Sequence, residues 1–587
     1  MTSGRRKGFI TFPAAVAALA LGTAALSAVP AQAADTPPLP ENQSVQKRAT
    51  ASQAELLQTV KGSAAKLKQG ESGVPGADPE STADVPERTV DPKIIGGVAA
   101  TITEAPWMVQ LHYYDDKGTA DTADDDGYFC GGTLVAPAKV LTAAHCVDGL
   151  DWAANGAVVG GTSQLPVSGD LHGGRAVSVW RQWVNPSYND AAISGDVAVL
   201  TLGTALPYKT LQPASGTDTA LYAAGTRATV YGWGRTSSTS QDISETLRKA
   251  TVPIQSDSTC KSTYPVDFVA GQMTCAGVPA SGEDSGTVSP CNGDSGGPMV
   301  VNGRIAGVVS WGMKDCVEKG SYSVYAKTST LFPKINPRID DANLNGDFKA
   351  DLFARKSAGT AYNYYSTGQS FSGAESLGDW GGTNLVRQVD WNRDDYQDYV
   401  YRIGNGDLYW LRFDGVGEWV ETKIGKGWSS WKNILFPGDV TRDGNPDLVG
   451  IDKDGKIWTY PGRGDGTFGA RVGGGTGWGS VIVFGKGDYS GDGKPDLLTR
   501  DSLGRVWLYA GRDIPASPYA PKVQVGKGWG FTAYAGTGDN TGDGIADVIV
   551  RDKAGDLWIY PSRGSATAPF SARYKAGKGW NGFNLLG

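Results

Sequence analysis

The feature that most restricts the fold of this 587-residue chain is an acidic loop that recurs five times in its C-terminal part. The copies begin at Asn343, Asp390, Asp439, Asp488 and Asp539, and successive starts are 47, 49, 49 and 51 residues apart. Each loop precedes an apolar strand, a turn and an aromatic strand, and a Gly-Lys-Gly-Trp element recurs between copies. Four short strands in about fifty residues are typical of a propeller blade, so the sequence predicts a five-bladed β-propeller.

The loops themselves have the composition of a cation site. Carboxylates at alternate positions, a glycine for the sharp turn and a later aspartate give an oxygen-rich cage that suits structural Ca²⁺. An Asp/Asn-rich hairpin without an ion is the alternative. The first copy has Asn343 and lacks the central glycine, so calcium is expected above all in the last three copies. The candidate ligands are Asp390, Asn392, Asp394, Asp398, Asp439, Thr441, Asp443, Asp447, Asp488, Ser490, Asp492, Asp496, Asp539, Thr541, Asp543 and Asp547.

The far C-terminus supplies the piece that the first repeat lacks. Copies two to five follow a Trp-containing element and a short strand, whereas the first copy does not. The matching element is residues 579–587, which no later loop uses. Because a closed ring removes open sheet edges, we expect this last strand to complete the first blade.

A second motif, residues 291–298 (Cys-Asn-Gly-Asp-Ser-Gly-Gly-Pro), has the chemistry of an activated serine. A serine hydroxyl needs a base to take its proton and donors to hold the oxyanion that its attack creates. Gly293 lets the backbone turn one N–H beside that of Ser295, which gives two such donors. Two partner motifs lie upstream, Thr-Ala-Ala-His-Cys around His145 and Ser-Gly-Asp-Val-Ala around Asp196.

These motifs, in the order His, Asp, Ser, resemble those of the chymotrypsin-like (trypsin family) serine peptidases over about residues 94–338. The resemblance implies two antiparallel β-barrels. It also implies that His145 is the general base and acid, that Asp196 orients it, and that Ser295 is the nucleophile. The backbone N–H groups of Gly293 and Ser295 would form the oxyanion hole.

Residues 91–97 (Asp-Pro-Lys-Ile-Ile-Gly-Gly) resemble the activation site of the same family. The resemblance implies that an activating protease cuts after Lys93 and frees the amino group of Ile94, which then pairs with Asp294. A buried carboxylate without a partner is costly, so the uncut chain is expected to be a zymogen.

The resemblance also places the substrate-binding residues. Ser310, Trp311 and Gly312 match the strand that pairs with substrate backbone. Ser289 stands at the base of the specificity pocket, and Ser323 replaces a wall glycine. Because a neutral base leaves a Lys or Arg side chain uncompensated, we expect cleavage after apolar or aromatic residues. The alternative is a carboxylate supplied by a loop, from Asp284, Asp315 or Glu318.

The N-terminus predicts export. Residues 1–33 combine Arg5, Arg6 and Lys7 with an apolar run and a small-residue cleavage site, as secretory signals do. Residues 34–93 read as a propeptide that buries little, with one short helix around 52–67. No later segment is apolar enough to span a membrane, so the mature protein is expected to be extracellular. The predicted domains are 1–33 signal, 34–93 propeptide, 94–338 peptidase and 339–587 propeller.

All six cysteines fall inside the peptidase-like region, and an even count in a secreted chain indicates disulfides. No pair has the two-residue spacing of a typical zinc site, the competing interpretation. The family resemblance implies the pairs Cys130 with Cys146, Cys260 with Cys275, and Cys291 with Cys316. The net charge of −7 is mild, and no basic stripe indicates a nucleic-acid partner.

Together these features predict an all-β secreted serine endopeptidase zymogen, with no cofactor for catalysis and with a protein or peptide as substrate. The repeats resemble FG-GAP (VCBS-type) repeats over residues 339–587, and this module would tether the enzyme to a glycan or another cell-surface ligand. The alternative is a lectin- or adhesin-type binding protein in which the peptidase domain is accessory or inactive.

Overall fold

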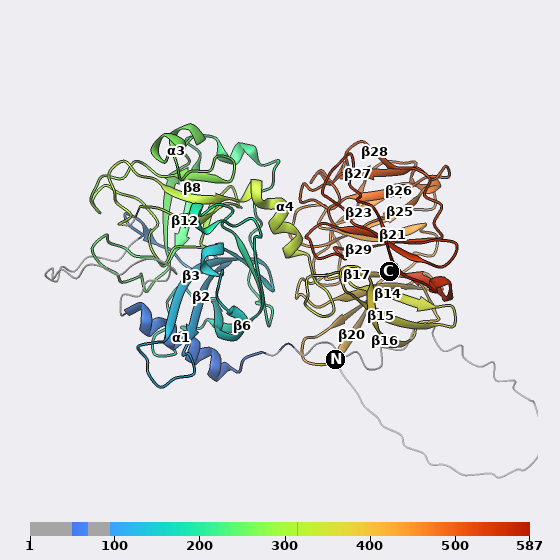
Figure 1. Ribbon diagram of the computed structural model, residues 1–587, viewed down its shortest axis with the longest axis horizontal. Coiled ribbons are helices and arrows are strands. Elements are labelled where there is room, and N and C mark those ends of the chain that lie inside the picture. The colour runs from blue at the N-terminus through green and yellow to red at the C-terminus, as the bar shows by residue number, and fades with distance from the viewer. Residues whose placement is uncertain (1–47, 49, 69–93, 314) are drawn as a thin grey trace, which may run out of the picture. The chain divides into compact units, whose positions relative to one another are not determined.

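The computed structural model describes residues 48, 50–68, 94–313 and 315–587. The predicted signal sequence and much of the predicted propeptide, including Lys93, lie outside these residues. The described chain is mostly β, as the sequence predicts. Figure 1 gives the element labels used below.

The first part of the peptidase is a closed six-stranded antiparallel barrel with the strand order β2-β3-β4-β7-β6-β5. Its inside is filled by aliphatic side chains, among them Val109, Leu111, Leu134 and Val158, all fully buried. The strands are β2 (Met108–Asp115), β3 (Asp126–Ala136), β4 (Lys139–Thr142), β5 (Gly156–Gly160), β6 (Arg175–Val184) and β7 (Ala198–Leu202).

The second part is a seven-stranded sheet with the order β1-β9-β8-β11-β12-β13-β10, which forms a half-barrel rather than a second closed ring. The strands are β1 (Val98–Ala99), β8 (Arg227–Gly232), β9 (Arg248–Pro253), β10 (Met273–Ala276), β11 (Pro298–Val301), β12 (Arg304–Trp311) and β13 (Ser323–Lys327). The three disulfides join the cysteine pairs that the family resemblance implies.

Helices are few. The expected propeptide helix is confirmed as α1 (Gln53–Lys68), which a capping box of Ser52 and Glu55 begins. The expectation that this segment buries little is wrong, because Leu56 and Val60 are buried. The peptidase ends in α4 (Thr328–Ile339), which follows directly on β13. The other helices described in the peptidase are η1 (Ala144–Cys146), α2 (Trp152–Asn155), η2 (Asp190–Ala192), η3 (Thr219–Tyr222) and α3 (Asp257–Thr263).

The repeats form five four-stranded antiparallel sheets, the blades of a propeller. Blade 2 comprises β17 (Thr383–Val389), β18 (Asp398–Ile403), β19 (Leu408–Phe413) and β20 (Trp419–Gly425). Blade 3 comprises β21 (Asn433–Gly438), β22 (Asp447–Ile451), β23 (Ile457–Tyr460) and β24 (Val472–Gly473). Blade 4 comprises β25 (Ile482–Phe484), β26 (Leu497–Arg500), β27 (Val506–Tyr509) and β28 (Val523–Gly526), preceded by η4 (Trp478–Ser480). Blade 5 comprises β29 (Ala533–Gly538), β30 (Asp547–Arg551), β31 (Leu557–Tyr560) and β32 (Tyr574–Gly577).

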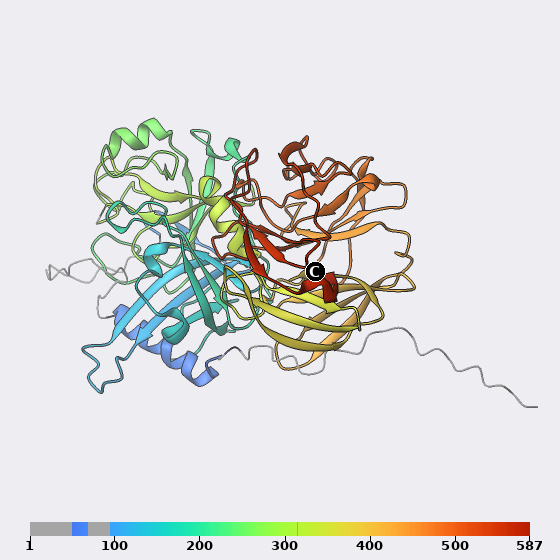
Figure 2. The ribbon, with the colours of Figure 1, turned by 45° about the vertical axis from the view of Figure 1, so that its right-hand side comes forward.

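Blade 1 takes its fourth strand from the end of the chain, which confirms the predicted closure. It comprises β14 (Leu352–Lys356), β15 (Thr360–Ser366), β16 (Phe371–Asp379) and β33 (Phe583–Leu586), after η5 (Trp580–Gly582). β33 pairs antiparallel with β14, and Ala354 lies opposite Leu586. Figure 1 marks the C-terminus near β14, and in Figure 2 the red end of the chain runs beside the yellow strands. Trp580 is buried with Phe583, Leu586 and Leu352 in this blade.

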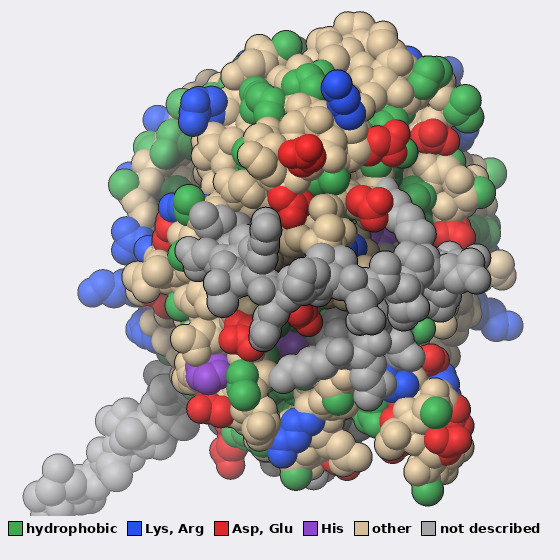
Figure 3. Space-filling view, turned by 90° about the vertical axis from the view of Figure 1, so that its left-hand side faces the viewer, with side chains coloured by type: hydrophobic (Ala, Val, Ile, Leu, Met, Phe, Trp, Pro, Cys, Tyr) green, Lys and Arg blue, Asp and Glu red, His purple; other side chains and the backbone are tan. Residues whose placement is uncertain are grey.

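The surface carries charges of both signs. On the face seen in Figure 3, lysine and arginine side chains are dispersed among aspartate and glutamate rather than gathered in one patch. Within the residues that the structure describes, no helix is long and apolar enough to cross a membrane.

Candidate active site

His145 and Asp196 come together at the end of the first barrel. His145 lies on η1, directly after β4, and Asp196 precedes β7, the strand that pairs with β4. The His145 Nδ1 lies 2.9 Å from Asp196 Oδ2, and the backbone N–H of His145 donates to Asp196 Oδ1 at 2.9 Å. Two contacts on one fully buried carboxylate fix both the position and the rotation of the imidazole.

The Asp196 carboxylate makes it easier for the His145 imidazole to take up a proton. Burial alone would lower the pKa of His145, but the adjacent Asp196 carboxylate outweighs burial and raises that pKa. Burial alone would likewise raise the pKa of Asp196, but the charge of His145 and the hydrogen bonds on the carboxylate lower it. The lowered pKa of Asp196 keeps its carboxylate ionised beside the imidazole.

A third side chain supports this aspartate, and the sequence reasoning gave it a different role. Ser310 was predicted only as part of the strand that binds substrate backbone. Its Oγ donates to Asp196 Oδ2 at 2.5 Å, so it also holds the carboxylate that orients His145. Beyond the family resemblance, the sequence carries no signal for this contact, since the two residues are 114 positions apart.

The loop that carries Ser295 lies directly against the loop that carries His145. Gly131 N donates to the Ser295 carbonyl at 2.8 Å, and the neighbouring Cys130 is disulfide-bonded to Cys146, next to His145. A side chain at Gly296 would collide with Thr142 Oγ1, three residues before His145. Gly293 has a φ of 91°, in the left-handed region that a loop of this shape requires and that glycine adopts without strain.

Asp294 lies fully buried behind this loop in a cradle of glycines. Its Oδ1 accepts a hydrogen bond from Gly234 N at 2.7 Å and its Oδ2 accepts one from Cys291 N at 2.9 Å. A side chain at Gly232 or Gly234 would overlap the carboxylate. Burial raises the pKa of Asp294 to about 7 despite these two donors, and no described lysine, arginine or histidine pairs with it.

The activation sequence reaches the same region. Ile94 and Ile95 are buried, and Ser289 N donates to the Ile95 carbonyl at 3.1 Å. The chain directly after position 93 is thus inside the fold, beside the pocket residue Ser289. Lys93 itself lies outside the described residues.

The predicted pocket residues Ser289 and Ser323 are neighbours. Their hydroxyl groups lie 2.8 Å apart, the Ser289 hydroxyl also donates to the Pro290 carbonyl, and both side chains are buried. The loop carboxylate Asp284 is engaged elsewhere, because Ser237 Oγ and Ser238 N donate to it at 2.7 and 2.9 Å. Trp311 packs edge-on against Tyr264 at a centroid distance of 4.9 Å.

The acidic loops connect the first and second strands of blades 2 to 5, and in blade 1 the loop leads from α4 into β14. Their last aspartate accepts backbone hydrogen bonds in every copy. In copy three, Asp447 accepts hydrogen bonds from Val440 N and Thr441 N within the loop and from Gly462 N in a later turn. The corresponding acceptors in the other copies are Asp351, Asp398, Asp496 and Asp547. This bonding is what the ion-free hairpin alternative requires, so recurrence of the aspartate alone does not indicate a metal.

Three carboxylates nevertheless converge in two of the loops. One oxygen each from Asp439, Asp443 and Asp447 lies within 4.8 Å of the others, and the same holds for Asp488, Asp492 and Asp496. Cationic side chains contact the loops of copies two, four and five, and in copy four Lys494 Nζ lies 3.5 Å from Asp492 Oδ2. Arg338 lies 3.7 Å from the first aspartate of copy five, and three cations surround Asp395 of copy two.

Asp395 replaces the glycine that copies three to five have at the same loop position, and it lies in a buried charge cluster. Lys139 Nζ and Arg181 Nη2 contact Asp395 Oδ1 at 2.6 and 2.8 Å, and both also contact Asp341. Burial would raise the pKa of Asp395, but Arg181, Lys139 and Arg48 together lower it. Nothing in the sequence predicts this cluster, and only the neighbouring loop residues match the expected pattern of metal ligands.

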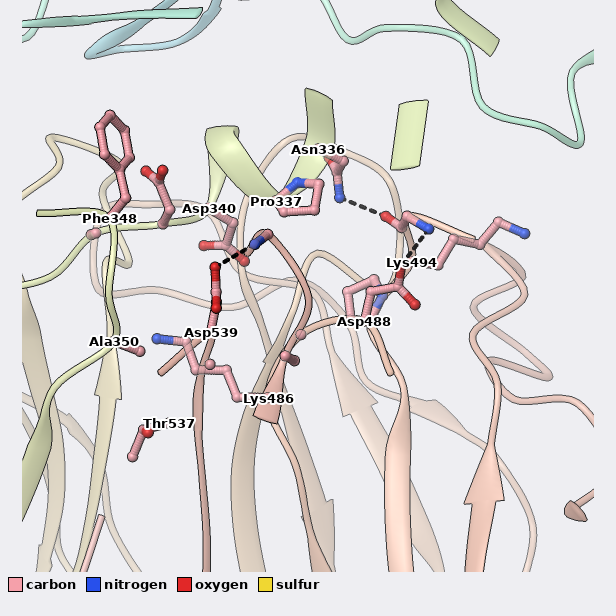
Figure 4. A pocket seen from close by; sticks show the side chains of 18 residues that line it. Asn336, Pro337, Asp340, Phe348, Ala350, Lys486, Asp488, Lys494, Thr537 and Asp539 are labelled. Carbon is pink, nitrogen blue, oxygen red and sulfur yellow. Dashed lines mark hydrogen bonds between the residues drawn. The ribbon is translucent and has the colours of Figure 1, made fainter. Parts of the chain in front are cut away.

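A small pocket with a volume of about 60 Å³ lies among the loops of blades 1, 4 and 5, where the end of α4 meets them. Figure 4 shows Lys486 reaching into it, with Asp340, Asp488 and Asp539 around it. Asn336 of α4 donates to the Gly493 carbonyl at 2.7 Å. No residue of the predicted catalytic site lines this pocket, so it is separate from the proposed chemistry.

The closed barrel, the half-barrel and the His145–Asp196 geometry are those of a serine peptidase. Residues 94–335 match the Trypsin family, and residues 439–499 match the FG-GAP-like repeat. A trypsin from Saccharopolyspora erythraea is 40% identical over 247 residues, which cover 42% of this chain and 98% of that protein. Trypsin from Sus scrofa and trypsin II-P29 from Gallus gallus are 31% and 34% identical, covering 40% and 42% of this chain and 91% and 90% of those proteins. The chain belongs to the trypsin family, and it is a serine endopeptidase that carries C-terminal repeats.

Proposed function

We propose that this chain is the secreted zymogen of an endopeptidase that works through an acyl-enzyme. Ser295 attacks the scissile carbonyl, His145 takes the serine proton and later gives it to the leaving amine, and Asp196 stabilises the imidazolium. The N–H groups of Gly293 and Ser295 hold the oxyanion. The observation that carries this proposal is the His145–Asp196–Ser310 network, with the Ser295 loop held against it by Gly131.

The experiment that tests the catalytic roles is labelling of the activated protein with a fluorophosphonate, which reacts with an activated serine. We expect one label per chain, on Ser295, and none on Ser295→Ala. His145→Ala should also lose the label, because without its base the serine is not activated. If the chain is instead a binding protein with an inactive peptidase domain, the wild-type protein should also fail to react with the fluorophosphonate after cleavage C-terminal to Lys93.

Activation by a cut after Lys93 is supported by the surroundings of Asp294. The carboxylate is buried with two backbone donors and no described cation, and burial raises its pKa. A free ammonium on Ile94, which is already buried in the same domain, would give that carboxylate a partner. The activating enzyme would have to cut after a lysine. Residues 1–33 would direct export before this step.

The pocket supports a preference for apolar residues before the scissile bond. Ser289 and Ser323 bond to each other, so the base of the pocket is neutral, and Asp284 is tied to Ser237 and Ser238. A lysine or arginine would enter without a carboxylate partner, at a cost of several kcal/mol for an uncompensated buried charge. The bulk of Ser323 in place of a glycine favours medium-sized side chains such as leucine or methionine over large aromatic ones.

Structural calcium in the propeller is best supported in copy three. Its Asp439, Asp443 and Asp447 converge, and its central Gly444 has a φ of 101° that permits the sharp turn. When bound, calcium would draw these loop oxygens together. Isothermal titration calorimetry with calcium should find one binding site fewer in the Asp443→Asn variant than in the wild-type protein. The matched control is Asp454→Asn, an exposed carboxylate in the same blade, and an equal loss in both variants would contradict the assignment.

The propeller would hold the enzyme on a glycan or another cell-surface ligand. The tryptophans of the Gly-Lys-Gly-Trp elements are buried, so they are not available for stacking on sugars. Half-buried Trp458, Trp507 and Trp558 lie on the third strands of blades 3 to 5, each under a lysine or arginine side chain. Binding to whole cells that falls in Trp558→Ala but not in Lys578→Ala, an exposed change in the same blade, would support this role.

A further inference from the structure

The segment that precedes the activation site is built into the surface of the peptidase. Both Figure 1 and Figure 2 show α1 running along β2 and β3 of the first barrel. Leu56 and Val60, one helical turn apart, are buried against Ala157, Val159 and Ala176 of β5 and β6. This apolar contact covers the outer face of the barrel, where an uncovered sheet would expose these side chains to water.

Beside this apolar stripe, the helix approaches β2 and β3 so closely that small residues are required. Gly62 lies on the ring of Tyr114, and any side chain at position 62 would overlap that ring. The next residue, Ser63, is fully buried and donates to the Tyr128 carbonyl at 2.9 Å. Its Oγ also lies 3.4 Å from Nδ1 of the buried His112, so a polar group of the barrel depends on the helix for a partner.

Arg48, upstream of the helix, has an even more enclosed position. Its guanidinium lies between the rings of Trp180 and Tyr396, at 4.1 and 3.8 Å from their centroids. It forms an ion pair with Asp395 at 3.0 Å and donates to the Leu202 carbonyl at 3.3 Å. Trp180 and Leu202 belong to the peptidase barrel, whereas Tyr396 and Asp395 belong to blade 2, so one side chain contacts both.

Nothing covalent would hold this segment after a cut behind Lys93, since all six cysteines pair within the peptidase. We propose that the segment from Arg48 to Lys68 nevertheless stays bound to the cleaved enzyme as a noncovalently held second chain. The proposal rests on the activation cut of the proposed function. Its physical basis is the buried apolar stripe, the close fit of Gly62 and the enclosed guanidinium of Arg48, which release would expose together.

The test separates the two pieces without relying on Lys93. A recognition site for a sequence-specific protease is inserted between positions 69 and 93 of the full chain, the purified protein is cut there, and gel filtration is followed by intact-mass analysis of each peak. We expect the N-terminal fragment to co-elute with the large fragment in a one-to-one ratio. A folded large fragment that elutes without it would overturn the proposal.

Matched variants locate the contact. Gly62→Leu places a leucine on the Tyr114 ring and should reduce the retained fragment by at least tenfold, whereas Ala65→Leu adds the same side chain on the exposed face and should retain it fully. Equal retention in both would contradict the docking. Should Gly62→Leu not fold, hydrogen exchange of residues 53–68 in the cut wild-type protein decides the matter, because a released 16-residue helix frays and exchanges fast, whereas a docked helix stays protected.

The natural cut distinguishes this proposal from the activation mechanism. If active enzyme has no new N-terminus at Ile94, the activation proposal is wrong. The experiment with the inserted protease site would still test whether the N-terminal fragment stays bound. A new N-terminus at Ile94 together with loss of the fragment from the folded enzyme would defeat the second-chain proposal alone.

Discussion

The peptidase and the propeller organise their sequence in opposite ways. In the peptidase, one network of unlike residues, His145 with Asp196 and Ser310, is assembled from segments up to 165 positions apart, and each part occurs once. In the propeller, the same loop and strands recur five times, and each blade contributes one four-stranded sheet. Loss of one part should therefore abolish function in the first region and reduce stability in the second.

The largest effect should come from the part of the peptidase network that has no substitute. Ser295→Ala should lower turnover by roughly a million-fold, as removal of a triad nucleophile does, with the melting temperature unchanged. Peptide hydrolysis by activated protein is the measurement. Near-normal turnover in this variant would mean that the single-network view of the peptidase is wrong.

The propeller has one non-repeated feature, the closing strand. Deletion of residues 579–587 removes the buried side chains of Trp580, Phe583 and Leu586 and leaves the edge of β14 unpaired. We expect the propeller to lose at least about 5 kcal/mol of stability, since each large buried side chain contributes several kcal/mol. Calorimetry measures the loss, activity on small peptides should be kept, and Lys578→Ala is the control that should melt like wild type.

The buried Asp294 adds a pH dependence to the stability of the uncut chain, alongside that of buried loop aspartates such as Asp447 in the repeats. The pKa of Asp294 is about 7 in the folded precursor and about 4 when unfolded, so the folded state holds the extra proton between these values. The stabilising contribution of this group is complete below about pH 4 and is lost as the pH rises to about 7. The expected loss is on the order of 4 kcal/mol.

Denaturant titration of the uncut Lys93→Gln chain at several pH values measures this loss. Other buried aspartates contribute as well, so the comparison is with the double variant that also carries Asp294→Asn. Identical pH profiles for the two proteins would show that Asp294 is not the group responsible.

Lys93→Gln by itself should leave an uncut precursor whose activity is lower by at least about 100-fold, the cost of a missing oxyanion donor. Mass analysis establishes the N-terminus, and peptide hydrolysis gives the activity. Full activity in a chain that still begins before Lys93 would rule out this switch.

The smallest expected effect concerns selectivity, because Ser289 and Ser323 shape the pocket without entering the chemistry. Activated enzyme should cleave after Phe, Tyr, Leu or Met at least about tenfold faster than after Lys or Arg, a difference of about 1.4 kcal/mol or more. Ser289→Asp should move the preference towards Lys and Arg. A preference for Lys or Arg in the wild-type enzyme would mean that a loop carboxylate reaches the pocket.

The same contrast between the regions explains what the sequence could predict. Periodic features could be predicted, because the repeated acidic loops indicate the number of blades. The unused element at residues 579–587 indicates which strand closes the ring. Motif-bearing residues such as His145 and the cysteine pairs were accessible through the family resemblance. Single long-range contacts were not, because nothing local marks Ser310 as the donor to Asp196, or Arg48 as the partner of a residue 347 positions away.

The burial of α1 was missed for a related reason. A segment with only two buried aliphatic side chains, Leu56 and Val60, has too little apolar surface to predict packing from composition. Its docking also depends on the absence of a side chain at Gly62 and on the Arg48 guanidinium. The partners of both residues, the rings of Tyr114 and Trp180, are far away in the sequence, so the sequence does not reveal these contacts.

The pairing of β33 with β14 also sets an order of events during synthesis. About 230 residues separate the two strands, so β14 leaves the ribosome long before its neighbour exists. The peptidase can complete its barrel in that interval, while the ring keeps one strand edge that any other extended chain could occupy. Closure is a long-range step and is expected to be slow, so overproduction should cause aggregation through nascent propellers rather than through nascent peptidase domains.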